Sequence, residues 1–191
     1  MPTHTATLET KPLDPIGVEV LGLDLSRDID DARFAELRTV IMDEGLVLFR
    51  RQPLEDSVHE AVGMRLGRND DFLREDGSNE PVVVPISNVD AKGKVLPLDH
   101  FDMRTLEINE QWHTDSSFKQ YPAKASILAA HKVPTQGGGS EFADMRAAYD
   151  ALKPSMRNWL EGKLAVHSFI YSQGLIGGLP VLTKEDFRRL C

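Results

Sequence analysis

Two segments in the first third of the chain carry apolar residues at helical spacing. In the first, Phe34, Leu37 and Ile41 recur three to four residues apart, which places them on one helical face. Asp30 precedes the run as an N-cap, and Gly45 follows it as a natural stop. The second segment opens at Pro53 and Asp56 and continues through Leu66, where Gly67 ends it. The pattern therefore predicts two early helices.

Two shorter helices are expected near the other end of the chain. One contains Met145, Ala148 and Leu152, and the next opens at Pro154, since proline is tolerated in the first turn of a helix. In that second helix the helical spacing of Met156, Trp159 and Leu160 predicts a face in the core.

The remaining apolar runs are short and are typical of strands. Residues 90–110 have many charges and few apolar periods, so we expect a long loop there. Residues 1–15 should form a loose N-terminal tail, and 16–191 a single domain. Strands are expected at 16–25, 45–50, 82–86, 111–118, 125–131 and 163–170. The order is mixed α/β with a mainly β core, which favours a barrel or sandwich.

Composition narrows the class of protein. The 191 residues are 41% hydrophobic and 27% charged, as in ordinary globular domains, with a net charge of −8. That charge argues against nucleic-acid binding, although one or two buried cations could still hold a small anionic substrate. No apolar stretch approaches the length of a membrane span. Cys191 is the single cysteine, and no signal-like segment opens the chain, so a cytoplasmic location is expected.

Trp112-His113-Thr114-Asp115 is the segment with candidate chemistry. On a strand, positions i and i+2 project from the same face, so the imidazole and the carboxylate could converge on one cation. Two histidines and one carboxylate on one octahedral face suit Fe(II) and leave positions for a 2-oxo acid and dioxygen. By itself the His-x-Asp triplet is weak evidence for a metal site, because such triplets occur by chance and a polar pair on a surface strand is the simpler reading.

The surrounding motifs change this balance. Residues 112–118 (WHTDSSF), Pro122-Ala123, 127–130 (ILAA), Val133-Pro134 and 137–140 (GGGS) occur in the order typical of one family. Residues 45–53 and 86–90 match it further upstream. From about Gly17 to His167 the chain resembles the taurine and 2,4-dichlorophenoxyacetate dioxygenases (TauD/TfdA), and residues 138–152 are closest to the 2,4-dichlorophenoxyacetate branch.

The resemblance implies a double-stranded β-helix, a jelly-roll relative, that holds Fe(II) beside 2-oxoglutarate. His113 and Asp115 then match two iron ligands. Ser140 matches a threonine whose hydroxyl binds a carboxylate of 2-oxoglutarate, unless it merely follows the glycine turn. The implied reaction uses O2 and 2-oxoglutarate to hydroxylate a small organic acid, releasing succinate and CO2. Phenoxyalkanoate-like aryl ethers are the first substrate class to expect and sulfonates the second.

Two family features have no match in the chain. The family has a distal histidine ligand, followed by an arginine that pairs with 2-oxoglutarate. After Asp115 the chain has only His131 and His167, neither in the required context. We therefore expect the β-helix to be truncated, the domain to be incomplete at its C-terminus, and this chain alone to bind iron poorly. The alternative is a catalytically incomplete fragment or pseudo-enzyme that keeps the fold as a binding module. A homo-oligomer remains open.

A few other residues near these motifs have two readings. Trp112 is expected to pack in the interior in preference to stacking on substrate. His100 and Arg104 could bind a substrate carboxylate, although a solvated loop is the simpler reading. Asn88 matches a family position and could equally close a turn.

Overall fold

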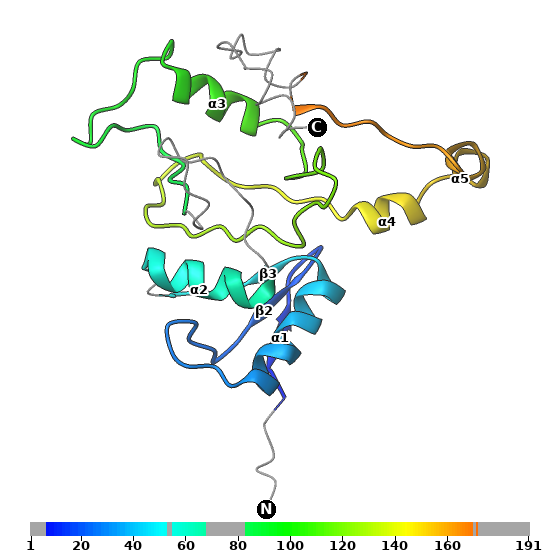
Figure 1. Ribbon diagram of the computed structural model, residues 1–191, viewed down its shortest axis with the longest axis horizontal. Helices are drawn as coiled ribbons and strands as arrows, with labels where there is room; N and C mark the ends of the chain where they lie inside the picture. Colours follow the sequence, from blue (N-terminus) through cyan, green and yellow to red (C-terminus); the bar gives the residue numbers. More distant parts are fainter. Residues whose placement is uncertain (1–6, 53–54, 68–82, 170, 172–191) are drawn as a thin grey trace, which may run out of the picture. The chain divides into compact units, whose positions relative to one another are not determined.

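A computed structural model describes residues 7–52, 55–67, 83–169 and 171 (Figure 1). It divides into two compact units. The first unit contains residues 1–68 and 127–163, and the second contains residues 69–126 and 164–191.

The first unit is built on a small mixed sheet in the order β1-β2-β3. Strand β1 (Thr10–Pro12) pairs antiparallel with β2 (Val18–Val20), and β2 pairs parallel with β3 (Val47–Leu48). Val18 and Val20 are buried on one face of β2, and Glu19 between them points to the other face, as the two-residue period of a strand requires.

Helix α1 (Asp31–Glu44) connects β2 to β3 and closes the core (Figure 1). The Asp30 carboxylate accepts from the amide of Arg33 at 2.8 Å, and Gly45 ends the helix in the left-handed conformation. Phe34 and Leu37 face inward. The core consists of apolar side chains from the first strands, the loop after them and α1, namely Leu8, Val18, Val20, Leu23, Leu25, Ile29, Phe34 and Leu37.

Helix α2 (Asp56–Leu66) is tied to this core by its basic side chains. The Arg65 guanidinium lies 4.0 Å from the centre of the Phe34 ring and donates to the carbonyl of Ile29 at 2.6 Å. His59 Nε2 lies 3.1 Å from the carbonyl oxygen of Ile127. This contact joins α2 to the segment that re-enters the first unit at residue 127.

Two short helices complete the first unit. Helix α4 (Met145–Asp150) begins at Asp144, whose carboxylate accepts from the amides of Arg146 and Ala147 at 2.8 and 3.3 Å. Helix α5 (Pro154–Leu160) begins with its proline. All four helices predicted from the sequence are confirmed.

The second unit contains helix α3 (Phe101–Asn109) and an isolated bridge between Val89 and Val95. The expectation of a loop throughout 90–110 is therefore wrong. The charged residues of 101–109 lie along an exposed surface of this helix. The helix was not predicted because the helical period of its apolar residues is too weak to recognise in the sequence.

Several predicted strands are also wrong. Among the described residues, 83–86, 111–118, 125–131 and 163–169 form no strand. Within 111–118 a turn begins at Asp115, and Ser116 has a φ of +56°, which breaks an extended run.

Within the predicted tail, Leu8 is buried and Thr10–Pro12 form β1, because β2 provides a partner for them. The double-stranded β-helix stays a prediction. None of the helices in the described segments is long and apolar enough to cross a bilayer.

Candidate metal centre

The structure brings His113 and Asp115 together in the second unit. Nε2 of His113 lies 3.4 Å from Oδ1 of Asp115. The two side chains are about half exposed, at 49% and 55% of their full area. An imidazole nitrogen and a carboxylate oxygen therefore face each other at a site that solvent and a cation can reach.

The backbone produces this geometry without the strand expected from the sequence. Trp112 to Thr114 lie outside any helix or strand, and the turn at residues 115–118 follows, with the amide of Lys119 donating to the carbonyl of Ser116 at 3.0 Å. Trp112 is 69% exposed, so the expectation that it packs in the interior is wrong. This irregular segment and the turn that follows it are sufficient to bring the side chains of His113 and Asp115 together.

Each member of the pair makes a further hydrogen bond through its other polar atom. Nδ1 of His113 lies 2.7 Å from the carbonyl oxygen of Gln111. The hydroxyl of Ser126 donates to Oδ2 of Asp115 at 2.5 Å. Sequence reasoning missed Ser126, which lies eleven residues further along the chain.

The donor atoms fit a divalent metal ion. Nitrogen and oxygen ligands lie about 2.0–2.2 Å from such an ion. Two neighbouring ligands on an octahedral face are then separated by about 3 Å, close to the observed distance between Nε2 and Oδ1. His113 and Asp115 can therefore bind one ion as neighbouring ligands.

A third protein ligand is not found in the part of the chain that the structure describes. There, no group of three or more His, Cys, Asp or Glu side chains is placed to hold a metal. His167 Nδ1 lies 2.6 Å from the hydroxyl of Ser117 in the second unit, and His131 is exposed in the first. Among the described residues, only two of the predicted ligands, His113 and Asp115, therefore lie together, and their role as metal ligands stays a prediction.

The other candidate residues lie in different surroundings. Ser140 is exposed after the glycine turn in the first unit, so its role toward 2-oxoglutarate stays a prediction. His100 Nδ1 lies 3.6 Å from Asp102 at the start of α3, and Arg104 is exposed on that helix. The carbonyl of Asn88 accepts from the amide of Leu96 at 2.9 Å. This backbone contact supports the reading in which Asn88 closes a turn.

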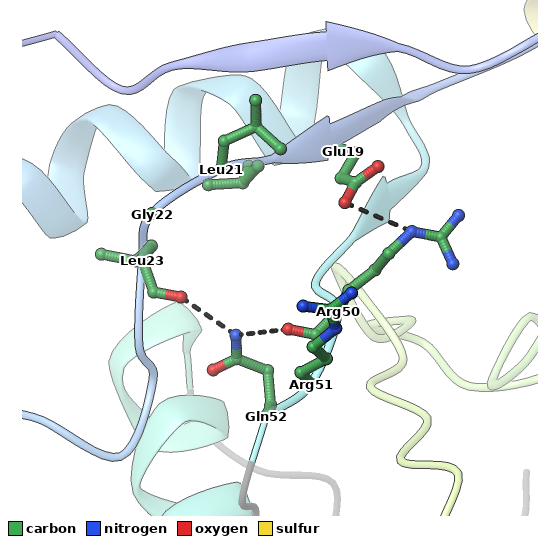
Figure 2. A pocket seen from close by; sticks show the side chains of 8 residues that line it. Glu19, Leu21, Gly22, Leu23, Arg50, Arg51 and Gln52 are labelled. Carbon is green, nitrogen blue, oxygen red and sulfur yellow. Dashed lines mark hydrogen bonds and ion pairs between the residues drawn. The ribbon is translucent and has the colours of Figure 1, made fainter.

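A cavity of about 240 Å³ lies in the first unit, between the end of β2 and residues 50–52 (Figure 2). Its polar groups are engaged with one another. Glu19 pairs with Arg50 at 3.2 Å, and Nε2 of Gln52 donates to the carbonyls of Leu23 and Arg50 at 3.0 and 3.1 Å (Figure 2). These contacts hold the chain after β3 against the end of β2. We assign the cavity a structural role, since it contains none of the predicted ligands.

Known proteins with similar sequences share one chemistry. A 2,4-dichlorophenoxyacetate dioxygenase of Cupriavidus pinatubonensis is 35% identical over 87% of this chain and 59% of its own length. An (S)-phenoxypropionate dioxygenase of Delftia acidovorans is 35% identical over 90% of this chain and 58% of its own length. Both names include α-ketoglutarate together with dioxygenase. The chain thus spans somewhat less than two thirds of the length of these curated relatives.

Solved structures agree with the sequence matches. A crystal structure of AAD-2 with Mn(II) and N-oxalylglycine aligns with a TM-score of 0.79 and 31% identity, over 97% of this chain and 64% of the other. N-oxalylglycine is an analogue of 2-oxoglutarate. A taurine dioxygenase from Burkholderia xenovorans aligns with a TM-score of 0.61 and 26% identity, over 86% of this chain and 54% of the other.

The family comparison covers nearly the whole sequence. Residues 9–189 match the family described as taurine catabolism dioxygenase TauD, TfdA family. This match contains the His113–Asp115 pair and most of both units of the structure. The chain belongs to the TauD/TfdA family of Fe(II)- and 2-oxoglutarate-dependent dioxygenases.

Proposed function

We propose that the protein is an Fe(II)- and 2-oxoglutarate-dependent dioxygenase that hydroxylates a small organic acid and releases succinate and CO2. The convergence of His113 Nε2 and Asp115 Oδ1 to 3.4 Å carries this proposal, in a chain whose family uses that chemistry. We extend the family fold to this protein as well, as a double-stranded β-helix. A cytoplasmic location is part of the proposal, supported by the single cysteine.

The residues of this chain have defined tasks in the proposed site. His113 and Asp115 hold the metal, which when bound supplies the activation of O2 that couples decarboxylation of 2-oxoglutarate to hydroxylation. Ser140 donates its hydroxyl hydrogen to a carboxylate of 2-oxoglutarate. We assign neither the remaining metal ligand nor a partner for the far carboxylate of 2-oxoglutarate to a residue of this chain.

Aryl ethers of the phenoxyalkanoate class are the first substrate that we propose. Support comes from the two relatives at 35% identity, whose names specify 2,4-dichlorophenoxyacetate and (S)-phenoxypropionate. Hydroxylation of the carbon bonded to the ether oxygen would give a hemiacetal, which breaks down to a phenol and a carbonyl compound. Sulfonates are the second choice. A sulfate ester dioxygenase of Pseudomonas putida, a related sulfur-containing case, is 31% identical over 88% of this chain.

A binding module without catalysis is the second candidate. It is favoured by the two-ligand site, since the described residues contain no third group placed for a metal. Such a module would keep the fold and bind a 2-oxo acid or a metal, without consuming O2.

One assay separates these candidates. The protein is incubated with Fe(II), 2-oxoglutarate and O2 together with phenoxyacetate, 2-phenoxypropionate or taurine, and succinate, phenol and sulfite are measured. We expect the unaltered protein to form succinate and phenol in equal amounts, and Asp115→Ala to form neither product. Formation of sulfite and succinate in equal amounts would identify sulfonates as the substrate class. Bound 2-oxoglutarate without succinate from any substrate would favour the binding module.

A further inference from the structure

The two carboxylate oxygens of Asp115 have different surroundings. Oδ2 accepts a hydrogen bond from the Ser126 hydroxyl. Oδ1 faces Nε2 of His113 at 3.4 Å. One oxygen is therefore engaged by Ser126, and the other faces the site where a metal fits.

The imidazole of His113 is held in a corresponding way. The carbonyl of Gln111 can only accept a hydrogen bond, so Nδ1, which lies 2.7 Å from it, carries the hydrogen. In a neutral ring Nε2 then keeps its lone pair for a cation. The two polar atoms that face each other are thus the two that can bind a metal.

We infer that Ser126 is a positioning residue of the metal site, which holds Asp115 so that Oδ1 alone binds the ion. This inference rests on the proposed function, because it assumes that His113 and Asp115 are metal ligands. In this inference Ser126 acts through Asp115 and is not itself a ligand of the metal. Loss of such a supporting hydrogen bond typically weakens metal binding by about 10- to 100-fold.

The first test measures Mn(II) affinity, with the loss of the free-ion signal in electron paramagnetic resonance as the readout. Ser126→Ala should weaken Mn(II) binding by about 10- to 100-fold, and Ser126→Thr, which keeps the hydroxyl, should restore most of it. Ser117→Ala is the matched control. Its hydroxyl belongs to the same unit but contacts His167 and the carbonyl of Thr114, so its loss should leave the affinity unchanged.

The second test reads the binding mode of the carboxylate. In infrared difference spectra between the Mn(II)-bound and metal-free protein, the antisymmetric and symmetric carboxylate bands lie further apart for one bound oxygen than for two. Asp115→Asn identifies the bands of this residue. We expect wide separation in the unaltered chain and narrower separation in Ser126→Ala, a change that a merely structural role for Ser126 would not produce.

The outcomes distinguish the inference from the proposed function. If Ser126→Ala binds Mn(II) as tightly as the unaltered chain with the same band separation, the role of Ser126 is refuted and the metal pair stands. If the unaltered chain binds no Mn(II), or if binding is unaffected in Asp115→Asn, both the inference and the proposed function fall.

Discussion

At the scale of single residues, Gly17 has the most restrictive position in the small sheet. It adopts a φ of +82° just before β2, and an added Cβ would lie 2.5 Å from the carbonyl oxygen of Leu46. That carbonyl accepts from the amide of Val18 at 3.0 Å at the junction of β2 and β3. A side chain at Gly17 would therefore strain the backbone and also press on the contact that joins the two strands.

Gly17→Ala should destabilise the protein more than Gly22→Ala. Gly22 also has a positive φ, of +65°, but an added Cβ would meet nothing within 4 Å. Backbone strain costs about 1–2 kcal/mol in both variants. The contact with Leu46 adds about 1–3 kcal/mol in the first alone. Urea unfolding measures both losses, and equal losses would show that the close approach to Leu46 does not restrict Gly17.

The proximity of His113 and Asp115 could be predicted from the sequence, but the hydrogen bond from Ser126 to Asp115 could not. His113 and Asp115 are two residues apart, so any locally extended backbone brings them to one side, even where the predicted strand is absent. Ser126 reaches Asp115 only because the chain turns back between them. The spacing of residues along the sequence does not predict where the chain turns back, so it does not predict this contact.

At the scale of elements, helix ends followed the sequence closely because capping is local. Asp30 and Gly45 bound α1 as predicted, through contacts within four residues. Asp144, which was not among the predicted caps, caps α4 through equally local contacts. Strands depend on partners elsewhere in the chain. Residues 111–118 and 125–131 were predicted as strands, yet among the described residues they pair with no neighbouring strand.

The cap of α4 predicts a contribution to stability that depends on pH. Hydrogen bonds from the amides of Arg146 and Ala147 hold the pKa of Asp144 below its ordinary value of 3.8. A carboxylate whose pKa is lower in the folded state stabilises the fold above its unfolded pKa. That contribution is lost as the pH falls through the folded pKa.

Asp144→Asn keeps a capping oxygen but cannot titrate. Its stability should therefore fall less steeply than that of the unaltered chain as the pH drops below about 4. Chemical unfolding across the acidic range measures this difference. Parallel curves for the two proteins would show that the cap of α4 does not contribute to the acid dependence.

At the scale of the whole molecule, burial is concentrated near the start of the chain. Among the described residues, every buried apolar side chain lies between Leu8 and Leu37. The expectation that Met156, Trp159 and Leu160 form a core face is wrong, since Trp159 is 62% exposed and Lys163 Nζ lies 4.6 Å from the centre of its ring. Helical spacing predicted the helix but did not indicate what would cover it.

The two tryptophans of the chain provide a test of this distribution. Trp112 and Trp159 are both more than half exposed, so the emission maximum should lie near that of tryptophan in water, with ready quenching by iodide. Trp112→Phe isolates the signal of Trp159. Emission shifted to the blue, together with protection from iodide, would show that these faces are covered in solution.

The assignment of His113 and Asp115 as metal ligands is tested most directly by anaerobic titration of the protein with Fe(II) in the presence of 2-oxoglutarate. Chelation of Fe(II) by 2-oxoglutarate at the protein site gives a visible charge-transfer band. At an Fe(II) concentration high enough to fill a site with two protein ligands, which binds iron weakly, we predict this band for the unaltered chain and for His131→Ala, a control at an exposed histidine without an assigned role. We predict its loss in His113→Ala and in Asp115→Ala. A band of undiminished intensity in either ligand variant, or its absence from the unaltered chain, would contradict the assignment.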